Sequence, residues 1–307
     1  MAISVTHFTD PGCPWAYSAS PALAVMYWRY GDQLEWRLAT IGLTEHADQY
    51  VSRGYTPQRA STGYLTFRRR WGMPFATQPR ERVVGTGRAC RAIVATRLRA
   101  PDREYAAFRA LQFGWFTTPL LLDDERDIAQ ALERVPGLDV DTIVGALDDD
   151  DVTEAYEADR AAARTAAGGP TEFQGKAAQT DGPVRFTAPS LIFESGDVRL
   201  EAGGFQPVEA YDVIVANLDP TLERRGAPDD VVDALAAFPD GLVTAEVAAI
   251  LTHGNDAPDA EAAEAALIEA VAEGRAVRTG LGDSALWQPA GAPADAAARR
   301  FERRAAV

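Results

Sequence analysis

Hydrophobic and polar residues alternate over two short segments near the start of the chain. Residues 3–8 place β-branched or aromatic side chains at alternate positions, and residues 34–41 repeat the pattern, so both are predicted strands. Between them, a helical pattern runs from Pro14 to about Tyr30 and ends at Gly31, since glycine commonly follows a helix C-terminus. The chain therefore opens with a strand–helix–strand unit.

The middle of the chain is helical by pattern, and strands return only after it. The expected helical block spans about 44–182, without a strand of note, and contains helices at roughly 81–99, 102–116, 124–134, 140–149 and 151–166. Residues 190–194 and 198–202 alternate again around a Ser-Gly-Asp turn, which predicts a hairpin. A last helix follows over 206–217. This order predicts an α/β protein with a thioredoxin fold that carries a large helical insertion.

The remaining residues predict a second, smaller unit. We expect the thioredoxin domain to span 1–219, a Pro- and Gly-containing linker to cover 220–227, a winged-helix-like domain to occupy 228–290, and a tail to follow over 291–307. The small domain would contain three helices (229–238, 244–251, 259–273) and two strands (276–278, 285–287). It carries twelve acidic residues and two arginines, which disfavours DNA binding. We expect it to dimerise or cover the main domain, and to be dispensable for the fold of 1–219.

Composition narrows the function further. The formal net charge of −15 disfavours nucleic-acid and anionic-membrane partners, because like charges repel. No apolar run is long enough to span a membrane, and the first residues do not form a secretory signal, so we expect a cytoplasmic protein. Two Cys and three His are scattered along the chain, and their spacing does not predict a metal site.

The most specific chemical feature is Cys13. It follows a predicted strand and the turn-forming residues Asp10-Pro11-Gly12, and Pro14 stands at the first helical position. Unpaired amides and the dipole at a helix start favour thiolate over thiol. A thiolate attacks disulfides and other electrophiles. Cys13 is therefore predicted to be an exposed nucleophile of lowered pKa; the alternative is a small buried core residue.

Four segments together resemble the DsbA-like oxidoreductases, a group that includes 2-hydroxychromene-2-carboxylate isomerases and kappa-class glutathione transferases. They are Asp10-Pro-Gly-Cys-Pro-Trp-Ala16, Glu35-Trp-Arg37, Thr187-Ala-Pro-Ser190 and Gly203-Gly-Phe-Gln-Pro207, and the resemblance covers about 1–219. It implies that Cys13 is catalytic and that Pro189 is cis and faces it. It further implies a cosubstrate groove shaped by Pro14, Trp15, Ala16, Ala188 and Pro189.

One difference from the family pattern sets the expected mechanism. Redox members carry a second cysteine where this chain has Ala16, and a single thiol needs an outside thiol to resolve its mixed disulfide. Cys90 lies in a predicted insertion helix and is interpreted as structural. We therefore expect a monothiol oxidoreductase that uses an external low-molecular-weight thiol as cosubstrate and holds no tightly bound cofactor.

Two other functions stay open at this stage. One is an isomerase or glutathione-transferase-like enzyme that acts on a small aromatic electrophile, which an aromatic pocket closed to peptides would favour. The other is a non-catalytic binding protein on a degenerate thioredoxin fold, which a buried sulfur of ordinary pKa would favour. The expected partner is a small-molecule substrate or thiol, and a homodimer is left open.

Several further side chains have both a functional and a structural interpretation. His7 could stabilise a Cys13 thiolate and Tyr17 could contact a substrate, but packing is the favoured interpretation of both. The insertion supplies hydrophobic residues that either form its core or roof the Cys13 site, with core favoured for most of them: Trp71, Met73, Phe75, Trp115 and Phe116.

Overall fold

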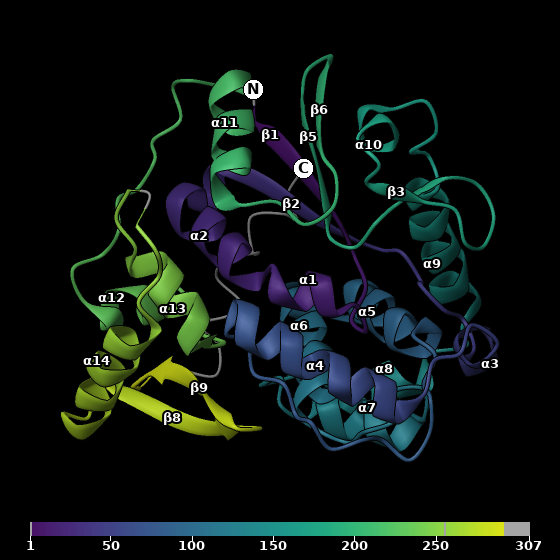
Figure 1. Ribbon diagram of the computed structural model, residues 1–307, viewed down its shortest axis with the longest axis horizontal. Helices are drawn as coiled ribbons and strands as arrows, with labels where there is room; N and C mark the ends of the chain where they lie inside the picture. Colours follow the sequence, from purple (N-terminus) through teal and green to yellow (C-terminus); the bar gives the residue numbers. More distant parts are fainter. Residues whose placement is uncertain (1, 255, 292–307) are drawn as a thin grey trace.

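The computed structural model describes residues 2–254 and 256–291. Its central sheet has the strand order β2-β1-β5-β6 (Figure 1). Strand β1 (Ile3–Thr9) pairs in parallel with β2 (Leu34–Thr40) and antiparallel with β5 (Ser190–Ser195), which pairs antiparallel with β6 (Val198–Ala202). The two predicted strands and the hairpin are confirmed, and with the flanking helices they form the predicted thioredoxin fold. Of the predicted tail, residues 292–307 lie outside the described residues.

Two helices replace the single one predicted after the first strand. They are α1 (Pro14–Ser18) and α2 (Ser20–Tyr30), with Ala19 between them. Pro21 lacks the N–H that would bond to the carbonyl of Tyr17, so the regular helical ladder is interrupted there. The short 3₁₀ helix after α2 leads directly into β2.

The sheet has a hydrophobic core on each face, because side chains alternate along β1. On one face, Ile3 and Val5 pack with α2 and with α11 (Val208–Leu218). On the other face, Phe8 stacks on Phe186, with 4.9 Å between ring centroids. This second cluster also contains Cys13, so the loop that follows β1 carries the cysteine into the edge of a packed core.

The helical insertion contains the five predicted helices. They are α5 (Gly87–Arg99), α6 (Glu104–Thr117), α7 (Glu125–Leu132), α8 (Val140–Gly145) and α9 (Asp150–Ala163). The first of them begins later than residue 81, because the backbone N–H groups of Thr86 and Gly87 bond to the carbonyl of Thr44 instead of extending the helix. In Figure 1, α5 to α8 lie at the lower right of the molecule and α9 stands at its right side.

Several elements of the insertion were not predicted. They are α3 (Ala47–Val51), α4 (Pro57–Trp71), α10 (Pro170–Phe173), and the paired strands β3 (Ala177–Ala178) and β4 (Arg185–Phe186). No strand of note was expected within 44–182; β3 is a two-residue strand inside that range, and its partner β4, also of two residues, lies just after it. Helix α4 has ordinary end signals: Oγ1 of Thr56 accepts from the N–H of Arg59, and Gly72 follows with φ of 70°.

The C-terminal segment contains the predicted helices and strands and one strand more. The elements are α12 (Val231–Ala236), β7 (Leu242–Val243), α13 (Thr244–Leu251), α14 (Ala260–Ala272), β8 (Ala276–Leu281) and β9 (Ser284–Pro289). The strands form a separate sheet in the order β7-β9-β8. The segment lies beside α2, at the left of Figure 1.

This segment shares a hydrophobic core with the main domain. Ala24, Val25 and Trp28 of α2 belong to the same buried cluster as Leu267 and Trp287 of the C-terminal segment. Helix α13 packs along α2. The segment therefore covers one side of α2, which is one of the two roles expected for it.

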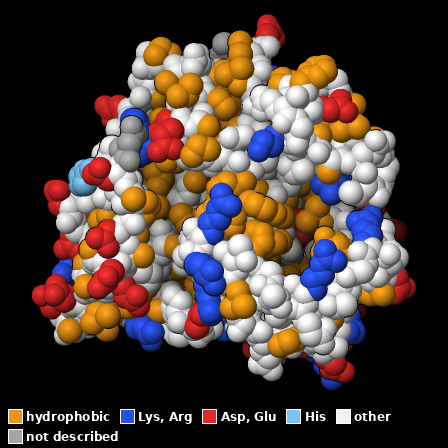
Figure 2. Space-filling model, viewed as in Figure 1, with side chains coloured by type: hydrophobic (Ala, Val, Ile, Leu, Met, Phe, Trp, Pro, Cys, Tyr) orange, Lys and Arg blue, Asp and Glu red, His pale blue; other side chains and the backbone are white. Residues whose placement is uncertain are grey.

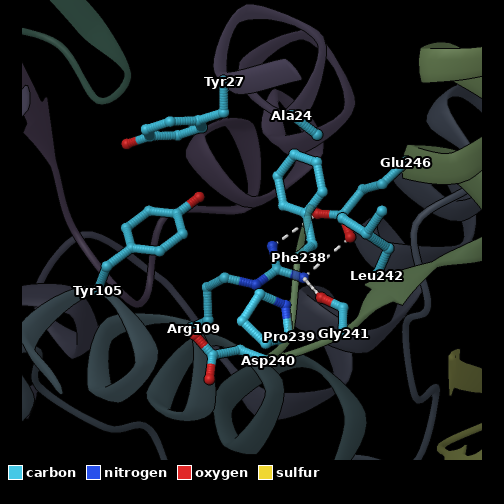
Figure 3. A pocket seen from close by; sticks show the side chains of 10 residues that line it. All are labelled: Ala24, Tyr27, Tyr105, Arg109, Phe238, Pro239, Asp240, Gly241, Leu242 and Glu246. Atoms are coloured by element: carbon cyan, nitrogen blue, oxygen red, sulfur yellow. Dashed lines mark hydrogen bonds and ion pairs between the residues drawn. The ribbon is translucent and has the colours of Figure 1, made fainter. Parts of the chain in front are cut away.

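A buried ion pair also joins the C-terminal segment to the main domain. Arg109 of α6 donates to both carboxylate oxygens of Glu246 in α13, at 2.6 and 2.9 Å (Figure 3). Ser20 of α2 donates to the same carboxylate. Glu246 is fully buried and Arg109 is 6% exposed. The C-terminal segment supplies both the carboxylate and part of the cover of Arg109, and the expectation that 1–219 folds without this segment stays a prediction.

Candidate active site

Cys13 lies at the start of α1, at the end of the loop that leaves β1. It is the residue before the helix, Pro14 is the first helical residue, and the carbonyl of Cys13 accepts from the N–H of Tyr17 at 3.0 Å. Its own N–H donates to the carbonyl of Asp10 at 3.1 Å, which closes the loop into a turn. The predicted strand-to-helix position of the cysteine is therefore confirmed.

The thiol itself is not exposed. Cys13 is 6% exposed, and burial raises the pKa of its thiol to about 12. The amides of Ala16 and Trp15 and the charge of Arg185 lower this pKa, but burial outweighs them, and the carboxyl of Asp10 raises the pKa further. The prediction of an exposed thiolate with a lowered pKa was wrong, because helix-start amides cannot compensate for the loss of water around the sulfur.

The segment that precedes β5 lies directly against the thiol. The Ala188–Pro189 peptide bond is cis, and Sγ of Cys13 donates to the carbonyl of Ala188 at 3.2 Å. Ala188 and Pro189 are both buried. The backbone that the resemblance assigns to a cosubstrate is thus in contact with the cysteine in this structure.

Asp10 holds the cysteine loop against the insertion. It is fully buried, and its carboxylate accepts from the N–H groups of Gly12 and Leu43, at 2.9 and 2.8 Å, and from the hydroxyl of Thr86 at 2.9 Å. Cys90 of α5 donates to the same carboxylate at 3.5 Å. Burial raises the pKa of Asp10, and these bonds lower it. Cys90 is fully buried, which agrees with its interpretation as structural.

Gly12 fits the loop because a side chain would not. A Cβ added there would lie 2.7 Å from Cγ2 of Thr86 and 2.8 Å from Cζ2 of Trp115. Real Cβ atoms essentially never approach so closely. Glycine therefore allows the cysteine loop to pack against the insertion helices α5 and α6.

A cavity of about 500 Å³ opens beside Cys13, between its loop and the helices α3 and α4. We call it the Cys13 pocket. Of the predicted site residues, it is lined by Cys13, Pro14 and Trp15. Ala16, Ala188 and Pro189 are buried and are not part of the lining. The structure thus brings all six predicted residues together, but only three of them face the cavity.

Aromatic side chains form much of the wall. Trp15 is 45% exposed and contacts Phe67, Trp71 and Phe205, with 5.1, 5.1 and 6.0 Å between ring centroids. Trp115 lines the pocket as well. The remaining insertion residues considered as a roof are core residues with at most 1% exposure: Met73, Phe75 and Phe116.

His7 and Tyr17 are packing residues. The ring of His7 meets Phe108 edge-on at 6.1 Å, and burial lowers the pKa of His7 to about 3. Tyr17 is fully buried and stacks on Phe116 at 4.6 Å. Both side chains are therefore buried packing residues, which was the favoured interpretation of each.

Sequence reasoning missed the basic side of the pocket. Its lining includes five arginines, from the turn after α3, from α4, from the loop before α5 and from β4: Arg53, Arg59, Arg80, Arg82 and Arg185. The bias of the chain toward arginine, with Lys176 as its single lysine, hid this cluster. The end signals of α4 could have revealed that helix, but not that it faces Cys13, since that depends on tertiary packing.

Within the described residues, no group of three or more His, Cys, Asp or Glu side chains is arranged to hold a metal ion. None of the described helices is both long and apolar enough to cross a bilayer.

Comparisons with known proteins place this geometry in a family context. A family model, the DSBA-like thioredoxin domain, matches residues 4–186. The chain is similar to a provisionally assigned protein disulfide isomerase from Nitrosomonas europaea (TM-score 0.54, 16% identity, covering 71% of this chain and 97% of that one). It is also similar to the cytosolic disulfide reductase DsbM from Pseudomonas aeruginosa (TM-score 0.51, 14% identity, covering 71% and 100%). A sequence search of curated proteins found no match.

Proposed function

Because the chain belongs to the DsbA-like thioredoxin family, we propose that it is a thiol–disulfide oxidoreductase that works through the single thiol of Cys13. The observation that carries the proposal is the position of this sulfur. Cys13 is the residue before α1, it contacts the carbonyl of Ala188, and it borders a cavity of about 500 Å³. That cavity has the size of a small-molecule site, so the partner we propose is a small disulfide or thiol.

The proposed reaction is a two-step exchange. The Cys13 thiolate attacks one sulfur of a disulfide RSSR, so that a Cys13–SR bond forms, the RS–SR bond breaks and RS⁻ leaves. An external thiolate then attacks the sulfur of R in the mixed disulfide and releases Cys13 as thiolate. Ala16 stands where a resolving cysteine would be needed, so the second step depends on the external thiol.

The buried position of the sulfur sets the pH dependence of this reaction. With a pKa raised to about 12, the thiol is protonated at neutral pH, and only the thiolate attacks. The amides of Trp15 and Ala16 and the charge of Arg185 support that thiolate once it forms. We therefore expect slow exchange at pH 7, with a rate that rises about tenfold per pH unit up to about pH 10.

The experiment is a turnover assay with 2-hydroxyethyl disulfide and a low-molecular-weight thiol. We expect the rate to depend on the thiol concentration and to be lost in Cys13→Ser. Cys90→Ser is the matched control, since its hydroxyl can still donate to Asp10, and its rate should equal that of the wild type. Full activity in Cys13→Ser would overturn the proposal.

Two specific observations support the alternative functions. The aromatic wall of the Cys13 pocket favours an isomerase or transferase that acts on a small aromatic electrophile; activity of that kind should survive Cys13→Ser if the site binds an activated thiol. The buried sulfur favours a non-catalytic binding protein, for which neither exchange nor isomerisation would be detected. A cytoplasmic location is part of the main proposal, because a reducing compartment supplies external thiols.

A further inference from the structure

The Cys13 pocket has a charge opposite to that of the protein. The chain has a formal net charge of −15, yet five arginines and, among the described residues, no Asp or Glu line the cavity. Figure 2 shows hydrophobic side chains gathered in the middle of one face, with basic side chains on either side of them and acidic ones mainly at the margins. A basic cavity in an acidic protein concentrates anions, because low-dielectric walls focus the field of the charges.

Three of the five arginines have backbone partners in place of carboxylates. Arg82 makes two bonds to the carboxylate of Asp123, at 2.7 and 2.6 Å, and Arg185 lies 3.6 Å from that of Asp181. The other three arginines of the lining form no ion pair with a described residue. These three donate to carbonyl oxygens: Arg53 to Thr180 at 3.1 Å, Arg59 to Gly54 at 3.3 Å, and Arg80 to Leu120 at 2.9 Å.

Arg80 has a side-chain N–H group without a hydrogen-bond partner among the described residues. Its Nε is bonded, but its Nη2 is buried and has no hydrogen-bond partner among the described residues. Its guanidinium lies 5.3 Å from the ring centroid of Trp115, which also lines the cavity. A guanidinium stays charged at all ordinary pH values, and a buried donor without a partner is costly. Arg80 lines the cavity, so its charge would attract an acidic group on a ligand.

Arg53 and Arg185 lie close together and form a second positively charged region of the pocket wall. Both bond to Thr180, Arg53 through the carbonyl at 3.1 Å and Arg185 through the hydroxyl at 3.2 Å. Thr180 itself lines the pocket. Residues far apart in the sequence are thus held together on one side of the cavity, near enough to Cys13 for Arg185 to lower the pKa of its thiol.

Aromatic side chains make up much of the rest of the wall. Trp15, Tyr55, Tyr64 and Phe67 line it together with Trp115. Aromatic faces stack on planar groups, and guanidinium groups bind carboxylates through paired N–H bonds. Resting on the proposed thiol function, we propose that the Cys13 pocket recognises small molecules that carry at least two carboxylates and a planar apolar part. The disulfide, thiol or electrophile that reaches Cys13 is then a polyanion.

Equilibrium binding to the full chain tests this without relying on catalysis. The probes are naphthalene-2,6-dicarboxylate and its neutral diamide, compared by calorimetry. We expect the dicarboxylate to bind at least about tenfold more tightly, and its affinity to fall with added salt, because charge-assisted bonds supply the difference. Equal affinities, or no binding of either probe, would overturn the proposal.

Variants locate the binding. Arg80→Gln and the exposed Arg59→Gln should each weaken dicarboxylate binding about tenfold, with little effect on the diamide. Arg59 is on the surface, so its replacement should not disturb folding. Arg126→Gln is the control, because Arg126 is 92% exposed and lies outside the pocket. If both pocket variants bind the dicarboxylate like Arg126→Gln, the arginines are not the ligand site.

The same measurements separate this inference from the proposed function. Binding of the dicarboxylate to the wild-type chain is measured without any exchange chemistry, so it does not depend on the proposed role of the Cys13 thiol. Exchange with the neutral 2-hydroxyethyl disulfide tests Cys13 alone. Exchange without charge-selective binding would leave the oxidoreductase proposal intact and refute the polyanion site. Charge-selective binding without exchange would support the polyanion site and refute the oxidoreductase proposal.

Discussion

The buried ion pair between Arg109 and Glu246 makes a sharp test of how the C-terminal segment is held. Glu246→Gln keeps the size of the side chain and one accepting oxygen, but it removes the charge and turns the other oxygen, which also accepts hydrogen bonds, into an NH2 group. Arg109 would then remain buried and charged, at 6% exposure, beside a neutral amide. Removing one partner of a buried pair costs about 3–5 kcal/mol.

The expected effect can be read by denaturation. Because the unfolding entropy is roughly 2 cal/mol/K per residue, each kcal/mol lowers the melting temperature of a chain of 307 residues by roughly 1.5 °C, so the loss should be about 5–8 °C, with a matching shift of the urea midpoint. The control is Glu264→Gln on the exposed side of α14, which should stay within about 0.5 kcal/mol of the wild type. Replacing both Arg109 and Glu246 by Leu should recover much of the loss, because apolar pairs often substitute well for buried ion pairs.

One result would refute this reasoning. If Glu246→Gln unfolds like Glu264→Gln, the ion pair does not couple α13 to α6, and the C-terminal segment is held by its hydrophobic contacts alone.

Three other predictions concern the site and its support. Burial lowers the pKa of His7 to about 3, so between about pH 3 and pH 6.5 the unfolded chain binds a proton that the folded chain does not. In that window the free energy of unfolding therefore rises with pH, by up to about 1.4 kcal/mol per pH unit. His7→Leu should remove this contribution and make the free energy of unfolding less dependent on pH. Urea titrations at several pH values measure this, and equal slopes for both proteins would contradict it. Gly12→Ala should displace Trp115 and cost about 1–3 kcal/mol, seen as a changed tryptophan fluorescence and a lower urea midpoint; an unchanged spectrum would mean that the contact is not tight. Ala16→Cys should let the introduced thiolate attack Cys13 in the mixed disulfide, so that an internal disulfide forms and RS⁻ leaves without an external thiol, which is then needed only to reduce the internal disulfide for the next turnover; a mixed disulfide that persists as in the wild type, measured by mass spectrometry, would show that the two sulfurs cannot meet.

Local patterns were sufficient to predict the thioredoxin sheet and its helices. Alternation marked β1 and β2 because one face of each strand is more buried than the other. The hairpin was marked by its Ser-Gly-Asp turn together with alternation, although β5 is mostly buried and β6 is exposed or half-buried up to its last residue. It could not show that Pro21 divides the first helix, although the proline itself was visible. The two-residue strands β3 and β4 are too short to give a periodic pattern.

The site was predictable in position but not in environment. The turn before Cys13 and the Pro189 segment were visible as sequence, and the structure brings them to within 3.2 Å, between Sγ and the carbonyl of Ala188. The burial that reverses the expected pKa shift comes from residues distant in the chain. The same holds for the arginine cluster, because which arginines face one cavity depends on packing among α3, α4 and β4.

The central claim, that Cys13 is the exchanging thiol, is tested most directly by peptide mass spectrometry after incubation with oxidised glutathione. The account predicts a glutathione adduct on Cys13 and none on Cys90, forming faster at pH 9 than at pH 7 and persisting until a second thiol is added. Cys13→Ser should carry no adduct. Modification of Cys90 in place of Cys13, or no adduct on Cys13 at either pH, would contradict the claim.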